Sequence, residues 1–166
     1  MEKHDIIEQL GLEHHPLEGG YFTRTYESDE RIANSRRRLL TSIYYMLTDN
    51  NSVGFLHKNR SDIIHYFHSG DPITYVTISE SGELEKHVLG MNLYAGQRPQ
   101  LLVRGGCWKA SVLTSGEYGL ISEAVSPGFE YCDNELATVE AIGSRFPNLL
   151  SILRPYIKNQ TSYHSE

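Results

Sequence analysis

Between residues 40 and 131 the chain is a succession of short apolar segments, each closed by a turn rich in glycine, proline, asparagine or serine. The segments cover residues 42–48, 53–57, 63–68, 73–78, 84–89, 101–103, 110–113 and 118–125. No stretch with the 3.6-residue spacing of an amphipathic helix separates them. Consecutive strands without intervening helices are typical of an all-β sandwich or barrel, so this pattern predicts an all-β fold.

The N-terminal part predicts one helix and one strand before this series begins. Asp5 can cap a helix with an apolar stripe over residues 6–10, and Gly11 can end it. Residues 21–26 alternate aromatic, β-branched and polar side chains, which predicts a strand. Residues 27–38 are polar and charged, and we expect them to form a surface loop.

The C-terminal part has a different pattern. Residues 137–146 and 148–157 have helical spacing, so we expect one or two helices after the strands. No internal repeat and no linker-like segment divides the sequence. We therefore expect a single domain over residues 1–166, with a barrel at about 20–133 and a helical tail at about 137–158.

The charge pattern argues against nucleic acid and membrane partners. Lys and Arg total 15 against 21 Asp and Glu, which gives a net charge of -6. The only basic run is residues 36–38, which is too short for a phosphate-binding stripe and is expected to be a solvated strand end. The longest apolar run, residues 39–47, is interrupted by Thr41 and Ser42 and is far shorter than the roughly 20 residues of a membrane span.

The two cysteines, Cys107 and Cys132, form neither a disulfide framework nor a C-x-x-C zinc motif. The first residues also lack the apolar stretch of a secretory signal. We therefore expect free thiols in a reducing cytoplasm.

Among the 8 histidines, His57 and His65 are the best candidates for chemistry, because they flank the polar turn 59–62. His68 is three residues from His65 and should face the other side of the same strand. Histidine suits proton transfer near neutral pH, although a single histidine on a strand is more often structural. No serine-nucleophile elbow, phosphate-binding loop or dinucleotide fingerprint occurs in the sequence.

Four segments, in order, resemble motifs of the cupins, in particular the small single-domain branch counted as the fifth cupin class. Residues 57–72 resemble its first motif, with His57, Ser-Asp, His-Tyr-Phe and Gly-Asp-Pro; residues 15–22, 96–108 and 125–131 resemble the other three. The resemblance implies a double-stranded β-helix, or jelly-roll barrel, with a ligand cavity inside. It also implies a homodimer.

The same resemblance argues against a metal cofactor. Cupins that bind metal usually supply His-x-His, a glutamate and a further histidine. The matching positions here hold His57, Asn59, Ile63 and Lys109, so one ligand of four is retained. A charged lysine would also repel a divalent ion. We therefore expect no metal and no other cofactor.

Strand alternation then predicts which side chains line the cavity. If position 63 faces the barrel interior, His65 and Phe67 face it too, with His57 and Asn59 at the same mouth and Lys109 opposite. The expected ligand-binding residues are His57, Asn59, Ile63, His65, Phe67, Lys109 and Ser111. An apolar pocket with a few polar groups is the usual form of a small-molecule site. We expect an acidic or sugar-like ligand and a cavity of about 300 Å³ or more.

Two alternatives remain open. The first is a metal-free isomerase or epimerase, with His57 or His65 as base, Tyr131 or Tyr118 as acid, and Asp62 orienting an imidazole. That mechanism requires a histidine that solvent can reach. The second is a dimeric scaffold in which apolar side chains fill the barrel and no ligand binds.

Overall fold

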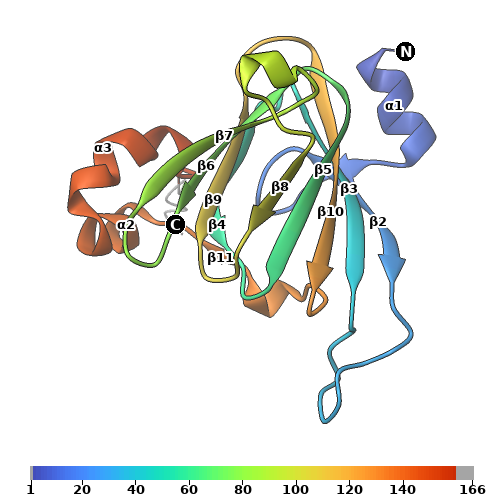
Figure 1. Cartoon of the computed structure of the whole chain (residues 1–166), viewed down its shortest axis with the longest axis horizontal. Helices are drawn as coiled ribbons and strands as arrows, with labels where there is room; N and C mark the ends of the chain where they lie inside the picture. Colours follow the sequence, from blue (N-terminus) through green and yellow to red (C-terminus); the bar gives the residue numbers. More distant parts are fainter. Residues whose placement is uncertain (1, 160–166) are drawn as a thin grey trace, which may run out of the picture.

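The computed structural model describes residues 2–159, which form two antiparallel β-sheets packed face to face (Figure 1). The first sheet has six strands in the order β1-β2-β3-β10-β5-β8, and the second has five in the order β11-β4-β9-β6-β7. The strands are β1 (Glu13–His14), β2 (Tyr21–Glu27), β3 (Thr41–Thr48), β4 (Val53–Lys58), β5 (Asp62–Gly70), β6 (Ile73–Ile78), β7 (Leu84–Leu89), β8 (Gln100–Val103), β9 (Trp108–Leu113), β10 (Tyr118–Ser126) and β11 (Glu135–Leu136). The predicted all-β jelly roll is confirmed. Position 1 and positions 160–166 of the predicted single domain lie outside the described residues.

The predicted N-terminal helix is α1 (Lys3–Leu10), and its start differs from the expectation. Glu2, not Asp5, is the N-cap, and Asp5 lies in the first turn, where its carboxylate accepts a hydrogen bond from the Glu2 amide at 3.2 Å. Gly11 ends the helix with a left-handed backbone at φ 61°, as predicted.

Side chains of β5 alternate between the two faces of the six-stranded sheet. Ile63 and His65 are buried and Phe67 is half-buried, whereas Tyr66 and His68 are exposed. The period of two therefore gives the predicted orientation of positions 63, 65 and 67 toward the barrel interior. His68 lies on the outer face, where its ring contacts the Tyr44 ring edge-on.

The core between the two sheets is aromatic and aliphatic. The six-stranded sheet supplies Tyr45, Leu47 and Ile121, while the five-stranded sheet supplies Ile73, Tyr75, Leu89 and Leu113. This cluster fills one half of the space between the sheets. Polar side chains occupy the other half.

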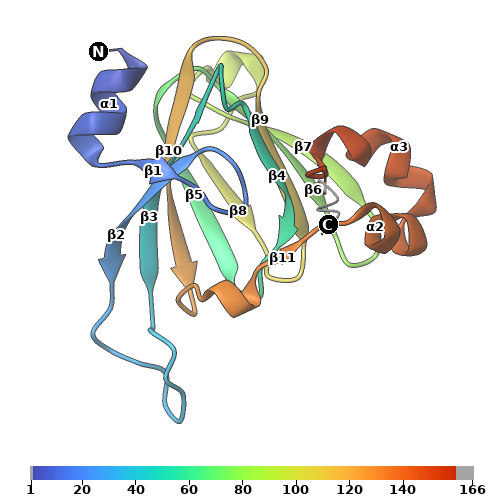
Figure 2. The same ribbon diagram turned by 180° about the vertical axis from the view of Figure 1, so that it is seen from behind.

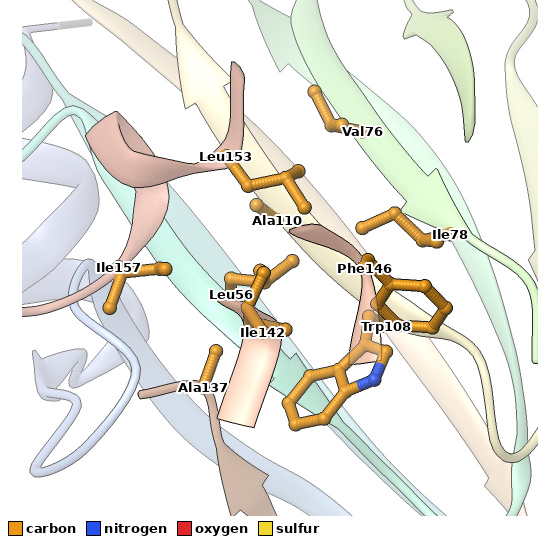
Figure 3. Close-up of a cluster of buried hydrophobic side chains, with 10 residues drawn as sticks. All are labelled: Leu56, Val76, Ile78, Trp108, Ala110, Ala137, Ile142, Phe146, Leu153 and Ile157. Atoms are coloured by element: carbon orange, nitrogen blue, oxygen red, sulfur yellow. The ribbon is translucent and has the colours of Figure 1, made fainter. Parts of the chain in front are cut away.

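A second apolar cluster lies on the outer face of the five-stranded sheet, beneath the C-terminal helices α2 (Val139–Arg145) and α3 (Leu150–Leu153) (Figure 3). Side chains of β4, β6 and β9 meet side chains of the tail, with Ile142 and Leu153 fully buried. The expected helix over 148–157 is shorter, because Pro155 cannot donate the next backbone hydrogen bond and α3 gives way to a 3-10 turn at Arg154–Tyr156. The members of the cluster are Leu56, Val76, Ile78, Trp108, Ala110, Ala137, Ile142, Phe146, Leu153 and Ile157.

The connection between β2 and β3 extends beyond the end of the barrel (Figure 2). It is the expected surface loop, but Arg37 within it is not a solvated strand end. Its guanidinium pairs with Asp133 and donates a hydrogen bond to the Gly128 carbonyl at 3.1 Å. The connection therefore holds the segment 127–134, which links β10 to β11 at the same end of the barrel.

Among residues 2–159, none of the helices has the length and apolar character required to cross a bilayer.

Candidate functional site

Six ionisable side chains are buried together in the polar half of the barrel. They come from separate elements: the turn before β2 supplies two, β4 and β5 one each, and β9 and β10 one each. They are His15, Glu18, His57, His65, Lys109 and Glu123. Buried charges are costly unless they are paired, so the pairing of this cluster determines its chemistry.

Lys109 lies at the centre of the cluster. Its ammonium nitrogen is 2.7 Å from Nε2 of His65 and donates to Oε1 of Glu123 at 3.1 Å. Burial raises the pKa of Glu123, but the positive charge around it, chiefly that of the Lys109 ammonium, outweighs burial and holds this pKa well below its usual range. Glu123 is therefore an ionised carboxylate, and its negative charge balances the positive charge of Lys109.

His65 is neutral and fully enclosed. Burial is the main cause that lowers its pKa, and the positive charge of Lys109 lowers it further. Its Nδ1–H donates to the Leu101 carbonyl at 3.2 Å, which leaves Nε2 to accept from Lys109. The ring is thus fixed in one tautomer between β8 and the lysine.

Glu18 reaches the cluster because the turn before β2 folds into the end of the barrel. Gly19 and Gly20 adopt left-handed backbone angles of 81° and 72°, and a Cβ on Gly19 would lie 2.4 Å from the Val53 carbonyl oxygen. Burial raises the pKa of Glu18, while the nearby His15 lowers it less. Asn134 donates a side-chain hydrogen bond to Oε1 of Glu18.

One ring nitrogen of His57 has a hydrogen-bond partner, and the other has none. Nδ1–H donates to the Phe55 carbonyl at 2.6 Å, and Nε2 lies 3.5 Å from Oε1 of Glu18 without a hydrogen bond. Burial and, to a lesser degree, Lys109 lower the pKa of His57 to about 4. The ring is therefore neutral near pH 7, and Nε2 is a buried acceptor.

Within the described residues, three buried side-chain atoms lack a hydrogen-bond partner, and all three are acceptors. They are Nε2 of His57, Oδ1 of Asn59 and Oδ1 of Asn134. Buried polar atoms are normally satisfied, so an orphan indicates a missing donor such as water or a ligand.

Two small hollows adjoin this cluster. The inner hollow, of about 10 Å³, is lined by Glu18, Tyr45, His57, Tyr75, Lys109, Ala110, Ser111 and Glu123. The mouth cavity, of about 30 Å³, is lined by His15, Glu18, Phe22, Arg24, Thr41, Ile43, Asn59, Glu123, Val125, Phe129 and Tyr131. Glu18 and Glu123 line both, so the two carboxyl groups separate the enclosed interior from the side that a ligand would approach.

The two hollows described at the cluster, of about 10 and 30 Å³, are far smaller than the expected cavity of about 300 Å³, so this expectation was wrong. Aromatic side chains such as Tyr45 and Tyr75 occupy the space instead. Hollows of about 330 Å³ beside β7 and β8, and about 400 Å³ beside the C-terminal helices, lie outside the barrel and away from the ionisable cluster.

The sequence-predicted site residues separate into two levels. His57, Lys109 and Ser111 line the inner hollow, and Ile63, His65 and Phe67 point into the barrel. Asn59 and Tyr131 line the mouth cavity. His57 lies below the mouth rather than beside Asn59, because the backbone carbonyl of Phe55 holds its ring inward.

Two further expectations about acid–base partners were wrong. Asp62 does not orient an imidazole, since its carboxylate accepts hydrogen bonds from the Gly105 amide and the Arg104 guanidinium, both at 2.8 Å. Tyr118 packs with the cluster around α1, because its position at the start of β10 lies at the other end of the barrel.

Sequence reasoning missed Glu123, His15 and Glu18 as site residues. Glu123 has the same parity as Ile121 and Val125 in an otherwise apolar strand, and a single inward carboxylate is a readable signal. His15 and Glu18 belong to the segment 15–22, which resembles a cupin motif but carries no separate signal of a site. Their roles depend on how the turn folds inward, which spacing alone does not show.

Comparison with protein families matches most of the chain to one family. The model described as "Cupin superfamily (DUF985)" matches residues 4–137, which is most of the chain. The chain belongs to the cupin superfamily. The predicted family is therefore confirmed.

Two solved structures are similar to this cupin over nearly their whole length, and a third shares only the fold. The crystal structure of protein SO0799 from Shewanella oneidensis is 35% identical, with a TM-score of 0.89, covering 96% of this chain and 99% of that one. A hypothetical protein from Leishmania major is 26% identical, with a TM-score of 0.90 and coverage of 96% and 100%. Oxalate decarboxylase from Bacillus subtilis shares the fold at 13% identity and a TM-score of 0.57, covering 90% of this chain and 40% of that one.

The uncharacterized protein YML079W of Saccharomyces cerevisiae is 35% identical over 134 residues, covering 70% of this chain. The match spans 66% of the yeast protein, which is slightly less than two thirds of its length. The names of the Shewanella, Leishmania and yeast relatives describe no activity.

The side chains of this cupin do not fit the metal site that the fold family implies. Ile63 offers no ligand atom, and the Lys109 ammonium lies between His65 and Glu123, where it repels a divalent cation. Within residues 2–159, no three His, Cys, Asp or Glu side chains are arranged to hold one ion.

Proposed function

We propose that this cupin binds a small, neutral, hydroxyl-bearing molecule of sugar-like chemistry at the mouth of the barrel, without a metal. The observation that carries the proposal is an orphan acceptor at the mouth, Oδ1 of Asn59. The two other orphan atoms of the site, Nε2 of His57 beside the inner hollow and Oδ1 of Asn134, are acceptors too. A ligand that satisfies them must donate hydrogen bonds. Hydroxyl groups donate, and their oxygens can also accept from the half-exposed Tyr131 at the rim.

The charge balance favours a neutral ligand over an acidic one. The acidic alternative relied on a free Lys109, but Glu123 already neutralises this lysine and no atom of Lys109 lines the mouth cavity. Arg24 at the rim pairs with Glu27 at 2.8 Å. An anionic group entering the mouth would instead meet two carboxyl groups, Glu18 and Glu123.

Binding requires the mouth to widen, since a volume of about 30 Å³ holds little more than one water molecule. The segment 127–134 carries Phe129 and Tyr131 over the mouth and is the element best placed to move. With this segment closed over the mouth, the structure also agrees with the scaffold alternative, in which no ligand binds. The binding experiment distinguishes the two.

The experiment is a ligand-detected NMR titration with three compounds of one carbon skeleton: glucose, gluconate and glucose 6-phosphate, extended to other neutral sugars and polyols. We expect saturable binding of at least one neutral sugar. Glu18→Gln should weaken this binding by roughly tenfold or more, the usual effect of removing a hydrogen bond to a charged group. Glu13→Gln, the same change at an exposed position of β1, is the matched control.

Binding of the acidic compounds alone would contradict the proposal. No binding across the whole panel would favour the scaffold.

The isomerase alternative required a histidine that solvent can reach, and with a histidine as base it fails, because both predicted bases are buried. One observation supports a different proton-transfer residue. Glu18 has a pKa raised by burial and lines the same cavity as Tyr131, whereas both predicted bases, His57 and His65, are buried and bonded to backbone carbonyls. A carboxyl group whose pKa is raised by burial can act as a general base or acid. Incubating a bound sugar with the protein in D2O should then place deuterium on carbon, and Glu18→Gln and Tyr131→Phe should each abolish it.

A further inference from the structure

We propose that the Lys109 ammonium is a resident cation that takes the position of a divalent metal ion inside the barrel, and that Lys109→His converts this position into a zinc- or cobalt-binding site. The proposal concerns the interior of the barrel and does not depend on whether a sugar binds at the mouth.

The first support is the spacing of the two groups that hold the ammonium. His65 Nε2 and Glu123 Oε1 are 3.2 Å apart, and each contacts the lysine nitrogen, at 2.7 Å and 3.1 Å respectively. Two ligands that bind one ion at about 2.1 Å each are separated by roughly 3.0–3.4 Å at octahedral or tetrahedral angles. The imidazole nitrogen and the carboxylate oxygen that hold the lysine nitrogen are therefore separated from each other as two ligands of one ion would be.

The second support is charge. Glu123 is an ionised, buried carboxylate, and Lys109 is the cation closest to it. Removing the lysine charge leaves this carboxylate unpaired in the interior, which is strongly destabilising. A divalent ion between Glu123 and His65 would restore the pairing. The lysine thus both holds the two ligand groups in place and excludes the ion.

The third support is what surrounds the ammonium. His57 pairs with Lys109 across the β4–β9 ladder, and its Nε2 is an orphan acceptor in the inner hollow. Glu18 lines the same hollow. A histidine side chain at position 109 is shorter than lysine by about one metal–nitrogen bond, ~2.1 Å. Its ring nitrogen would therefore coordinate an ion that lies where the ammonium was. With His65 and Glu123 it would supply three ligands, the number that an open zinc site uses.

The test is a cobalt titration followed by visible absorption, with zinc competition, on the full chain. We expect the wild-type protein to show no stoichiometric cobalt site. Lys109→His should bind one cobalt ion per chain, at least 100-fold more tightly than the wild type, with the intense absorption of a tetrahedral ion. Adding Glu123→Gln to Lys109→His should weaken binding by more than tenfold, because it removes a direct ligand.

Two results would overturn the proposal. One is a wild-type protein that binds one divalent ion per chain and loses it on Glu123→Gln, since the ion would then be the natural cation. The other is a folded Lys109→His that gains no cobalt site. If Lys109→His does not fold alone, zinc should restore its folding and its thermal transition. Failure of zinc to restore the folding of Lys109→His also overturns the proposal.

Discussion

At the scale of single residues, the polar half of the barrel holds six buried ionisable groups, and few of them form ion pairs. Two acids, one lysine and three imidazoles are buried together, and the only full ion pair is that of Lys109 with Glu123. The imidazoles remain neutral because burial is the largest cause acting on the pKa of His15, His57 and His65, and it lowers all three. The stability of the fold should therefore depend on pH in the acid range.

We predict that the protein loses stability as the pH falls from about 6.5 to 4. The pKa of His57 is lowered to about 4, so the unfolded chain binds more protons than the folded one across this window, and the free energy of unfolding falls with pH. For His57 alone the loss is about 3 kcal/mol over the window. Glu18, whose pKa is raised, acts in the opposite direction, so a comparison of variants is required.

The measurement is urea unfolding at several pH values. His57→Asn should show a smaller loss between pH 6.5 and 4 than the wild type, because no group at position 57 then takes up a proton on unfolding. His68→Asn, at an exposed position on the outer face of β5, should follow the wild type. Equal pH dependence in all three proteins would refute the neutral state assigned to His57.

The sequence predicted part of this cluster, for a clear physical reason. Successive side chains of a strand point to opposite faces of the sheet, so the shared inward orientation of Ile63, His65 and Phe67 could be predicted. Glu123 had the same signal but was treated as part of an apolar run. The depth of His57 could not be predicted, because it depends on a hydrogen bond to the Phe55 carbonyl.

At the scale of elements, the mouth is controlled by two connections that are distant in sequence. Arg37, between β2 and β3, forms two hydrogen bonds to the Asp133 carboxylate, and its neighbour Arg38 accepts one from the Gly128 amide at 2.9 Å. Asn134, next to Asp133, bonds the buried Glu18. The Arg37–Asp133 pair, here called the surface clamp, is thus joined to the buried Glu18 carboxyl group through Asn134, the residue next to Asp133. The sequence predicted the first connection as a surface loop, yet not its contact with the second, since long-range pairing leaves no local pattern.

We predict that Arg37→Ala loosens the segment 127–134. Amide hydrogen exchange in this segment should be roughly tenfold faster or more, the effect of losing a charge-assisted hydrogen bond, whereas exchange in β5 and β9 should not change. Arg36→Ala removes an exposed neighbouring charge and serves as the control. If exchange in segment 127–134 is unchanged in Arg37→Ala, the clamp does not hold the mouth closed.

At the scale of the whole molecule, the two sheets are covered unequally. The C-terminal helices bury the outer face of the five-stranded sheet, but α1 covers only one end of the six-stranded sheet, around Met46 and Leu120. Near the other end, Ile64, Tyr66 and Leu102 share an outer face, with Tyr66 36% and Leu102 42% exposed. The sequence predicted the helical tail by its spacing, yet which sheet the tail covers could only be seen in the fold.

We propose that this face joins two copies of the chain, in line with the dimer expected from the family resemblance. Light scattering after size exclusion should then give twice the mass of 18.9 kDa. Tyr66→Glu should shift the protein toward the monomer, since it places a charge in an apolar contact. Tyr94→Glu, at a fully exposed tyrosine outside this face, should remain dimeric. A dimer that tolerates Tyr66→Glu would place the contact elsewhere.

The most direct test of the central claim is native mass spectrometry of the untagged protein, purified gently and without chelator. The account predicts a bound mass that denaturation releases and that belongs to a neutral, hydroxyl-bearing compound, with this adduct lost in Glu18→Gln and retained in Glu13→Gln. A bound metal ion, or an adduct that carries a carboxylate or phosphate, would contradict it.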